Sequence, residues 1–285
     1  MVNDGVYIKN IVKDRCRVCG EHEQKLLFAQ GKFEVIRCIK CGFGTLRPIP
    51  TEKELLSIYQ GDYHQYLEDE DFLADARKKY NFLKPYLIRG DKVLDVGCGL
   101  GHLLSIAQED GMEVLGYDVS LEAAKMANKR YGVDVVTKKF EKKVFEKKSF
   151  AMISLFDVIE HIVQFKKTIG VYQDWLVDDG ILVMTTPDID AWDARLMGKK
   201  WYGYTRIPQH INYFNRNSIK LVLEELGFEV VECRLWGFVR SLEYIARTMG
   251  GGEVVQKLVK IMRLYKYQIY LPMIDMIIVA RKVSH

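Results

Sequence analysis

The stretch "KVLDVGCGLGH", residues 92–102, decides the fold class, because it joins an apolar strand to a helix through closely spaced glycines. Asp95 stands at the end of the apolar run, and the glycines of the loop are Gly97, Gly99 and Gly101. Glycine allows a sharp turn and the close approach of a ligand. Dinucleotide-binding loops have the spacing G-x-G-x-x-G, whose last glycine would fall at His102. The spacing here is D-x-G-x-G-x-G, which favours a nucleoside with a small charged tail over a pyrophosphate.

Strands and helices alternate along the chain after this loop. Apolar runs predict strands at 113–120, 133–137, 150–156, 180–186, 228–236 and 276–283. Helical patterns predict helices at about 72–88, 102–110, 121–131, about 157–177, 216–227, about 238–249 and about 253–268. This alternation predicts an α/β fold, with a mostly parallel sheet and helices on both faces.

A second acid follows the next strand, in "GYDVS", about twenty residues beyond the glycine loop. Asp118 in this position can accept hydrogen bonds from both ribose hydroxyls of a bound nucleoside. The alternative is that Asp118 caps the next helix together with Ser120. We favour the ribose, because strand, glycine loop and acid occur together.

Two C-x-x-C pairs lie near the N-terminus, in "CRVCG" and "CIKCG". Cys16 and Cys19 are separated from Cys38 and Cys41 by residues 20–37, a spacing typical of four-cysteine zinc sites. Disulfides are the alternative, and they fit poorly with a cytoplasmic chain. The pattern predicts a zinc ribbon over residues 1–50, a linker with helices over 51–90 and a larger domain over 91–285.

The stretch "SLFDVIEHI", residues 154–162, places Asp157, Glu160 and His161 one helical turn apart. Asp157 and Glu160 have the spacing of a capping box at a helix start. Capping does not explain His161, and a second histidine, His210, stands in "PQHINYF". We predict that His161 and His210 act as an acid–base pair on a methyl acceptor. The alternative is that these four residues hold a divalent metal ion that lowers the pKa of the acceptor.

These motifs together resemble a known family. "VLDVGCGLG", "GYDVS" and "SFAMISLFDVIEHI" occur in the order and at the separations of class I S-adenosylmethionine (SAM)-dependent methyltransferases. The zinc ribbon before them is similar to that of sugar- and glycan-pathway methyltransferases. The acid-x-x-Glu-His motif resembles that of ubiquinone-pathway O-methyltransferases and, with a distant histidine, that of small-RNA 2′-O-methyltransferases. The resemblance implies a Rossmann-like sheet of seven strands, whose last strand runs antiparallel beside the fifth.

The resemblance also implies roles for individual residues. Gly97 and Gly99 would line the methionine part of SAM, Asp118 would bind the ribose, and Leu155 and Phe156 would lie beneath the sulfonium. Val119 and Phe140 would flank the adenine, although "TKKFEKK" places lysines, Lys139 among them, where many relatives have a small residue and an acid. The full predicted cofactor set is Asp95, Gly97, Cys98, Gly99, Gly101, Asp118, Val119, Phe140, Leu155 and Phe156.

The segment 187–214 is too long for a plain connection and too aromatic for a solvated one. Its aromatic residues either wall a substrate pocket or pack as a lid over the sheet: Trp192, Trp201, Tyr202, Tyr204 and Tyr213. The basic amphipathic pattern at 253–268 is typical of a domain helix with a solvated face, and contact with a membrane surface is the alternative.

Composition narrows the function further. The 285 residues carry a formal charge of +4, too small and too scattered to argue for nucleic acid. No apolar run approaches the roughly 20 residues of a membrane span, and no signal peptide is evident, so we expect a cytoplasmic protein. We predict a SAM-dependent O-methyltransferase, acting on a hydroxyl, or secondarily a carbon, of a small molecule, sugar or glycan precursor. The alternative is an RNA-directed methyltransferase or RNA-binding module that uses the ribbon.

Overall fold

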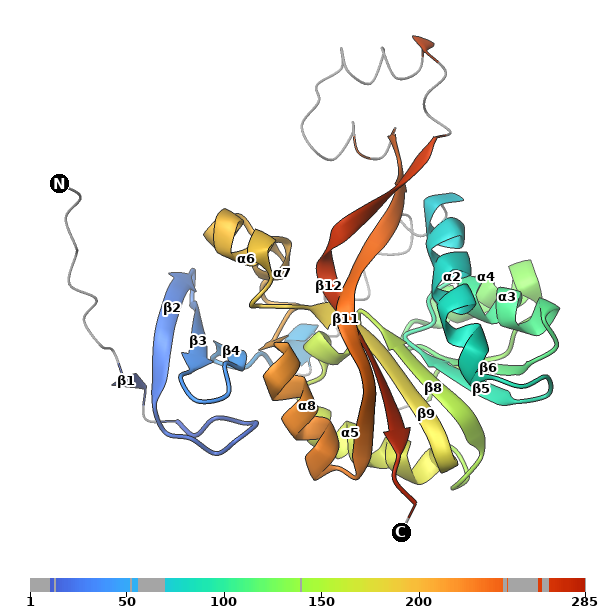
Figure 1. The fold of residues 1–285 in the computed structure, drawn as a ribbon, viewed down its shortest axis with the longest axis horizontal. Coiled ribbons are helices and arrows are strands. Elements are labelled where there is room, and N and C mark those ends of the chain that lie inside the picture. Colours follow the sequence, from blue (N-terminus) through green and yellow to red (C-terminus); the bar gives the residue numbers. More distant parts are fainter. Residues whose placement is uncertain are drawn as a thin grey trace.

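The computed structural model of the chain describes residues 11–12, 14–51, 53–55, 70–138, 140–242, 245, 261–262 and 267–284. Their strands form one sheet of seven strands and one of five (Figure 1). Within these ranges no helix is long and apolar enough to cross a bilayer. The predicted basic helix at 253–268 lies almost entirely outside the described residues.

The larger sheet has the strand order β11-β12-β9-β8-β5-β6-β7. Its strands are β5 (Lys92–Val96), β6 (Glu113–Tyr117), β7 (Val135–Val136), β8 (Phe150–Phe156), β9 (Leu176–Pro187), β11 (Phe228–Ser241) and β12 (Gln268–Lys282). The pairs from β7 to β9 are parallel, whereas β12 runs antiparallel between β9 and β11. The predicted α/β fold is confirmed, including a last strand antiparallel to the fifth. The strand order reverses between β5 and β8, so ligands are expected at the carboxyl ends of these strands.

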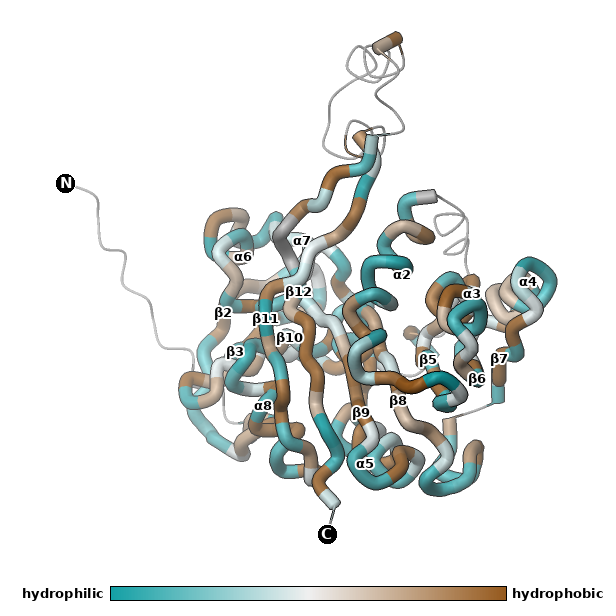
Figure 2. Tube along the Cα trace, turned by 45° about the vertical axis from the view of Figure 1, so that its right-hand side comes forward, coloured by the Kyte–Doolittle hydropathy of each residue, from teal (hydrophilic) through white to brown (hydrophobic). Residues whose placement is uncertain are grey.

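Helices cover both faces of this sheet. Successive side chains of a strand point to opposite faces, and here both sets are apolar and must be buried. Val93, Val183 and Ile277 face α2 (Glu70–Leu83) and α3 (His102–Glu109). Leu94 and Met184, one position further along their strands, face α5 (Phe165–Trp175) and α8 (Arg216–Glu225). The tube in Figure 2 shows the apolar strands enclosed between these helices. A fifth helix, α4 (Leu121–Tyr131), packs beside α3 through a smaller apolar cluster.

The smaller sheet combines the N-terminal segment with a strand from far along the chain. Its strands are β1 (Ile11–Val12), β2 (Gln24–Gln30), β3 (Phe33–Cys38), β4 (Gly44–Arg47) and β10 (Asn212–Tyr213). β10 pairs antiparallel with β4, so Asn212 lies opposite Thr45. Behind this pair the ring of Phe43 contacts the rings of Phe165 and Phe214, at centroid distances of 5.6 and 5.1 Å. The ribbon segment is therefore built into the larger domain.

Three short helices lie between β9 and β10. They are α6 (Trp192–Met197), the 3-10 helix η4 (Gly198–Lys200) and α7 (Tyr202–Thr205). The side chains of Ala194 and Trp201 are buried against residues of the ribbon, including Phe28 and Val35. These contacts fix the segment over the smaller sheet.

Two predicted helices differ from the structure. The helix expected at about 157–177 begins only at Phe165, after a 3-10 turn η3 (Ile159–His161). The first part of the helix expected at 238–249 is strand, because β11 continues to Ser241. There it pairs with the first residues of β12, and the two strands extend past β9 as a two-stranded arm (Figure 1). Asp71 and Asp75 of α2 hold this arm by accepting hydrogen bonds from the backbone of Ser241 and Val239.

Candidate active site

An open cavity of about 2400 Å³ lies at the carboxyl ends of β5, β6 and β8. Its walls come from the glycine loop, from α2, from the α6–α7 segment and from the two-stranded arm, which contributes Phe238, Arg240 and Leu271. Eight of the ten predicted cofactor residues line it: Asp95, Gly97, Cys98, Gly99, Asp118, Val119, Phe140 and Phe156. The cavity thus forms where strand order reverses, as expected for an α/β sheet.

Two predicted cofactor residues do not line the cavity. Gly101 has a φ of +77° and begins α3, but a Cβ on it would lie 2.9 Å from Val133 and 3.1 Å from Ala127. Its absent side chain therefore serves the packing of the loop on α4. Leu155 is fully buried in the core, because adjacent residues of a strand point to opposite faces and Phe156 takes the cavity side. The prediction that Leu155 lies beneath the sulfonium disagrees with this placement.

The glycine loop turns sharply between β5 and α3. Gly97 has a φ of +73°, and its N–H donates to the carbonyl oxygen of Tyr117 at 2.7 Å. A Cβ at this position would lie 2.5 Å from the Cγ2 atom of Val158, so only glycine fits the turn. Asp118 holds the loop from the other side, accepting the N–H of Gly99 at 2.9 Å and that of Ser120 at 2.8 Å. Ser120 alone caps α4, by accepting the N–H of Ala123.

Asp95 is buried at the end of β5 and accepts a hydrogen bond of 2.6 Å from the hydroxyl of Ser154. Burial raises the pKa of Asp95 to about 7, against the smaller opposing effects of Ser154 and Lys79. The carboxyl group is therefore close to its midpoint at neutral pH. A ligand cation beside it would favour the ionised form.

The side of the cavity where the adenine is predicted is aromatic. Phe140 meets Tyr117 edge to face at a centroid distance of 5.8 Å, and Val119 is exposed beside the loop. The neighbouring Lys139 lies outside the described residues. Apolar walls, a carboxylate at the ribose position and backbone amides of a glycine loop fit the parts of SAM.

Asp157 does not cap a helix, contrary to the prediction. It has a φ of +59°, its N–H donates to Thr185 of β9, and its Oδ1 accepts the hydroxyl of Thr185 at 2.7 Å. Its other oxygen lies 3.7 Å from the Nζ atom of Lys79. Burial alone would raise the pKa of Asp157. The charge of Lys79 and the hydrogen bonds that Asp157 accepts have the larger, opposite effect, so the pKa is lowered and Asp157 is a carboxylate at the cavity wall.

Lys79 is a cavity residue that the sequence does not reveal. It also pairs with Asp75 at 3.3 Å, one turn earlier on α2, and its ammonium lies over the ring of Phe156 at 4.7 Å. Burial lowers the pKa of Lys79, but Asp157 and Asp75 raise it more, so the lysine stays charged. Behind this pair, burial and the charge of Asp157 raise the pKa of Asp275 well above its usual range. A lone acid in an apolar strand was the only sequence signal for Asp275.

Glu160, His161 and His210 come together beside the cavity. One oxygen or nitrogen of each lies within 4.8 Å of the others, and the two imidazole rings meet edge to face at 4.8 Å. Only His161 lines the cavity, whereas Glu160 and His210 are buried behind it. Asp157 is not part of this group. The two predicted histidines are therefore adjacent in space, although 48 residues lie between His161 and His210 in sequence.

Carbonyl oxygens orient both imidazole rings. Nδ1 of His161 lies 2.9 Å from the carbonyl oxygen of Gln209, and Nδ1 of His210 lies 2.9 Å from that of Gly203. A carbonyl oxygen only accepts, so each Nδ1 is placed to donate. Burial lowers the pKa of His161, and it lowers that of His210 to about 3. Burial also raises the pKa of Glu160 well above its usual range, and Asp157 adds to this effect.

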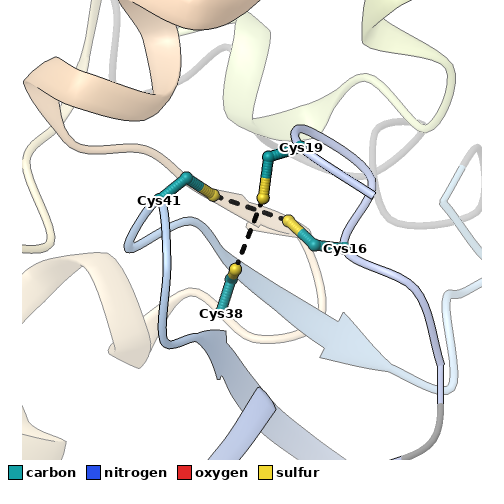
Figure 3. Close-up of side chains that lie close together, drawn as sticks. All are labelled: Cys16, Cys19, Cys38 and Cys41. Atoms are coloured by element: carbon teal, nitrogen blue, oxygen red, sulfur yellow. Dashed lines mark hydrogen bonds between the residues drawn. The ribbon is translucent and has the colours of Figure 1, made fainter. Parts of the chain in front are cut away.

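The four N-terminal cysteines converge in the ribbon (Figure 3). The Sγ atoms of Cys16 and Cys41 are 3.5 Å apart, those of Cys19 and Cys38 are 3.6 Å apart, and none is in a disulfide. Four sulfurs at ~2.3 Å around a tetrahedral zinc ion would lie ~3.8 Å apart. The donor set and the spacing therefore fit structural zinc, which would be held by these four thiolates.

The ribbon reaches the histidine site through β10. The N–H of Ile211, next to His210, donates to the carbonyl oxygen of Glu160 at 2.9 Å, and the side chain of Asn212 donates to that of Ile162 at 2.8 Å. Arg17, inside the first cysteine pair, donates to Asn212 at 3.0 Å and to the carbonyl oxygen of Val163. A residue between two cysteines thus contacts both β10 and the turn that follows η3.

The aromatic residues of segment 187–214 divide between the two predicted roles. Trp201, Tyr204 and Tyr213 are buried against the ribbon. Trp192 and Tyr202 are exposed and line the cavity. The segment is therefore both a packed layer and a cavity wall.

Comparison with known proteins agrees with this site. The profile of a family described as "Methyltransferase domain" matches residues 65–233, more than half of the chain. An uncharacterized protein of Methanocaldococcus jannaschii is 38% identical over 101 residues, which cover 35% of this chain and 38% of that one. A ubiquinone/menaquinone biosynthesis C-methyltransferase of Campylobacter jejuni is 22% identical over 191 residues, covering 58% of this chain and 81% of its own.

Solved structures show the same fold at low sequence identity. A 1,6-didemethyltoxoflavin-N1-methyltransferase of Burkholderia thailandensis, solved with its substrate and S-adenosylhomocysteine, has a TM-score of 0.57 at 15% identity, over 91% of this chain and 99% of its own. A SAM-dependent methyltransferase of Archaeoglobus fulgidus has a TM-score of 0.51 at 20% identity, over 78% and 100%. The glycine loop, the reversal of strand order and the family match agree, and this chain belongs to the class I SAM-dependent methyltransferases.

Proposed function

We propose that this protein transfers the methyl group of SAM to a hydroxyl of a small molecule, sugar or glycan precursor, with His161 as the general base. SAM supplies an electrophilic methyl group on its sulfonium. The observation that carries the proposal is the position of His161, which lines the cavity that the glycine loop also lines. In this proposal Asp118 binds the ribose, and Asp95 and the loop amides hold the methionine part.

The proton of the acceptor hydroxyl would pass to Nε2 of His161. The ring is oriented by the contact of its Nδ1 atom with the carbonyl oxygen of Gln209, at 2.9 Å. The lowered pKa of His161 keeps the imidazole neutral at pH 7, as a base requires. Glu160 and His210 stand behind it as the next groups that could take or return a proton, and the oxygen Oε1 of Glu160 lies 3.9 Å from Nε2 of His161.

A bound divalent metal ion is a second candidate for the same residues. Two imidazoles and a carboxyl group converge within 4.8 Å, and Oε2 of Glu160 is buried without a hydrogen bond among the described residues. Two imidazoles and a carboxylate are a donor set that several divalent transition metals accept. Glu160, His161 and His210 would hold the ion, which would lower the pKa of the acceptor hydroxyl.

Carbon is the alternative acceptor atom. Two of the similar proteins are named as a C-methyltransferase of ubiquinone/menaquinone biosynthesis and a demethylmenaquinone methyltransferase. A carbon beside a hydroxyl also becomes nucleophilic when that hydroxyl loses its proton, so the same base would serve. RNA is less well supported, because Arg17, Arg37 and Arg47 of the ribbon are engaged within the chain by Asn212, Asp190 and Glu34.

The first experiment identifies the acceptor. Isotopically labelled SAM and the protein are incubated with a fractionated metabolite pool and, separately, with total RNA, and mass spectrometry locates the label. Label in a small molecule supports the proposal, and label in RNA alone contradicts it. Calorimetry with SAM is run beside it, because absence of SAM binding by the folded protein would remove the basis of the whole proposal.

With the acceptor known, His161→Ala is expected to lower turnover by about 10²-fold or more, since a general base is lost, while SAM binding is retained. His22→Ala, an exposed histidine of the ribbon, is the matched control and should keep full activity. Full activity in His161→Ala would refute the role of the base.

The metal content of the purified protein distinguishes the general-base hypothesis from the metal-site hypothesis. If the site holds a metal ion, the purified wild type carries one metal equivalent more than His210→Ala, beyond the ion of the cysteine cluster. Equal metal content in both proteins would exclude a metal ion at these residues and retain the acid–base role.

A further inference from the structure

Apart from Thr205, the exposed side chains of the α6–α7 segment are apolar or cationic. Within residues 191–206 we call eight of them the docking patch: Trp192, Arg195, Leu196, Met197, Lys199, Lys200, Tyr202 and Arg206. The four apolar members are 51%, 76%, 49% and 38% exposed, in sequence order. Trp201 and Ala194 are buried beneath them, so the patch is presented by a fixed surface. Apolar and polar stretches alternate along this segment in Figure 2.

The charge of the docking patch has one sign. The only acid between residues 191 and 206 is Asp193, which is buried and accepts the indole N–H of Trp201 at 3.1 Å. The guanidinium of Arg206 lies over the ring of Tyr202 at 5.3 Å, and Arg195 lies 3.9 Å from Asp190. Four cations thus surround four exposed apolar side chains, a composition that complements an anionic, partly apolar surface.

The kind of partner follows from the aliphatic members. Cations and aromatic rings alone would also suit RNA, whose bases stack on aromatic side chains. Leu196 and Met197 have no such partner on RNA, yet Leu196 is the most exposed apolar residue of the patch. Apolar side chains beside lysine and arginine are typical of segments that lie in the interface of a membrane.

The docking patch also forms one wall of the candidate active-site cavity. Trp192, Leu196, Met197, Lys200, Tyr202 and Arg206 line its rim. We propose that the docking patch binds the surface of a membrane that contains anionic lipids, with Trp192, Leu196 and Met197 among the headgroups and the four cations on lipid phosphates. The cavity would then open toward the lipid. This binding does not depend on the proposed methyl transfer.

The chain has its own reporter for this binding. Of its four tryptophans, Trp175, Trp201 and Trp236 are at most 4% exposed, so Trp192 is the tryptophan whose surroundings a membrane would change. The full-length protein is mixed with vesicles of phosphatidylcholine alone or with phosphatidylglycerol added. We expect co-sedimentation and a blue-shifted emission with the anionic vesicles, both reduced at high salt. Trp192→Phe should remove the emission shift while retaining most of the binding.

Matched variants test the two components separately. Leu196→Ser is expected to weaken vesicle binding by about tenfold, whereas Leu221→Ser, on the exposed face of α8, should leave it unchanged. The double change Lys199→Glu and Lys200→Glu should weaken binding to anionic vesicles by more than about tenfold. The control is Lys125→Glu with Lys129→Glu on α4. It has the same net charge as the Lys199 and Lys200 variant, but it should bind as the wild type does.

Three results would overturn the inference. They are absence of binding to both kinds of vesicle, equal binding by Leu196→Ser and the wild type, and equal weakening by the two lysine pairs. Self-association in solution that Leu196→Ser abolishes, without vesicle binding, would assign the patch to a second copy of the chain. Binding of single-stranded RNA instead of vesicles, lost in the Lys199 and Lys200 variant, would assign it to RNA. Calorimetry with SAM, run on every variant, confirms that each has folded.

Discussion

At the scale of single residues, two acids divide the work of the cofactor end. Asp118 is held by two backbone N–H groups, which fix its carboxylate at the end of β6. Asp95 is buried instead, and its raised pKa makes its charge depend on pH near neutrality.

Asp95 should make SAM binding depend on pH. Its pKa of about 7 in the free protein exceeds the ordinary value, so the carboxyl is protonated below pH 7 and must lose its proton when the ammonium of SAM binds. Affinity should therefore weaken by up to about tenfold per pH unit below 7 and level off above it. Calorimetry between about pH 5.5 and 8.5 measures this slope. Asp95→Asn should bind weakly and without the slope, and an unchanged slope in that variant would contradict the assignment.

Asp118→Ala should weaken SAM binding by about 1.5–3 kcal/mol, the scale of losing hydrogen bonds to a charged group. The variant also frees the N–H of Gly99, so part of the loss arises from a looser glycine loop. Asp134→Ala, on the connection to β7, is a control outside the cavity. Equal affinity of Asp118→Ala and the wild type would exclude the ribose role.

At the scale of elements, the sequence predicts regular segments well and tertiary exceptions poorly. Strands β5, β6 and β8 and helices α3 and α4 follow from their apolar periods. The late start of α5 does not, because Asp157 takes a left-handed conformation to reach Thr185 of a neighbouring strand. β10 has only two residues, and its partner Thr45 is remote in sequence, so no local pattern marks it.

The same limit applies to the candidate site. His161 and His210 stand out in sequence because no local structural role explains them. Lys79 does not, because a lysine on a helix is normally solvent-exposed, and only the packing of α2 against β8 brings it to Asp157.

The cysteine cluster should support turnover through β10. We expect about one zinc ion per chain at Cys16, Cys19, Cys38 and Cys41, measured by elemental analysis. Cys38→Ser should lose this ion and loosen the ribbon, which limited proteolysis detects. Because β4 holds β10 beside His210, turnover should fall while SAM affinity stays close to normal. Cys233→Ser, outside the cluster, is the control. Disulfides in place of zinc, or full turnover in Cys38→Ser, would contradict this prediction.

At the scale of the whole molecule, the ribbon and the larger sheet share a core. Phe43 from the ribbon is fully buried against Phe165 of α5 and Phe214, which precedes α8. Lys166 of α5 donates to the carbonyl oxygen of Val18, and Asn217 of α8 to that of Cys41. The ribbon predicted over residues 1–50 therefore packs directly on the larger domain.

We expect the two parts to unfold in a single transition by calorimetry. A protein that begins at residue 51 would expose Phe165 and Phe214 and leave β10 without its partner. It should be less stable than the full chain by about 3 kcal/mol or more, from the apolar surface of two phenylalanines. Two separate transitions in the full chain, or an unchanged melting temperature in the truncated one, would contradict this expectation.

The arm formed by β11 and β12 has a consequence for how the protein changes over generations. The residues of β12 that precede Asp275 pair with β11 and not with β9. Phe238, Arg240 and Leu271 of the arm nevertheless form a wall of the cavity, opposite the glycine loop. Selection can therefore act on this wall almost independently of the cofactor end. Related chains that keep the loop and differ in the arm would be the natural place to look for a divergence in methyl acceptors.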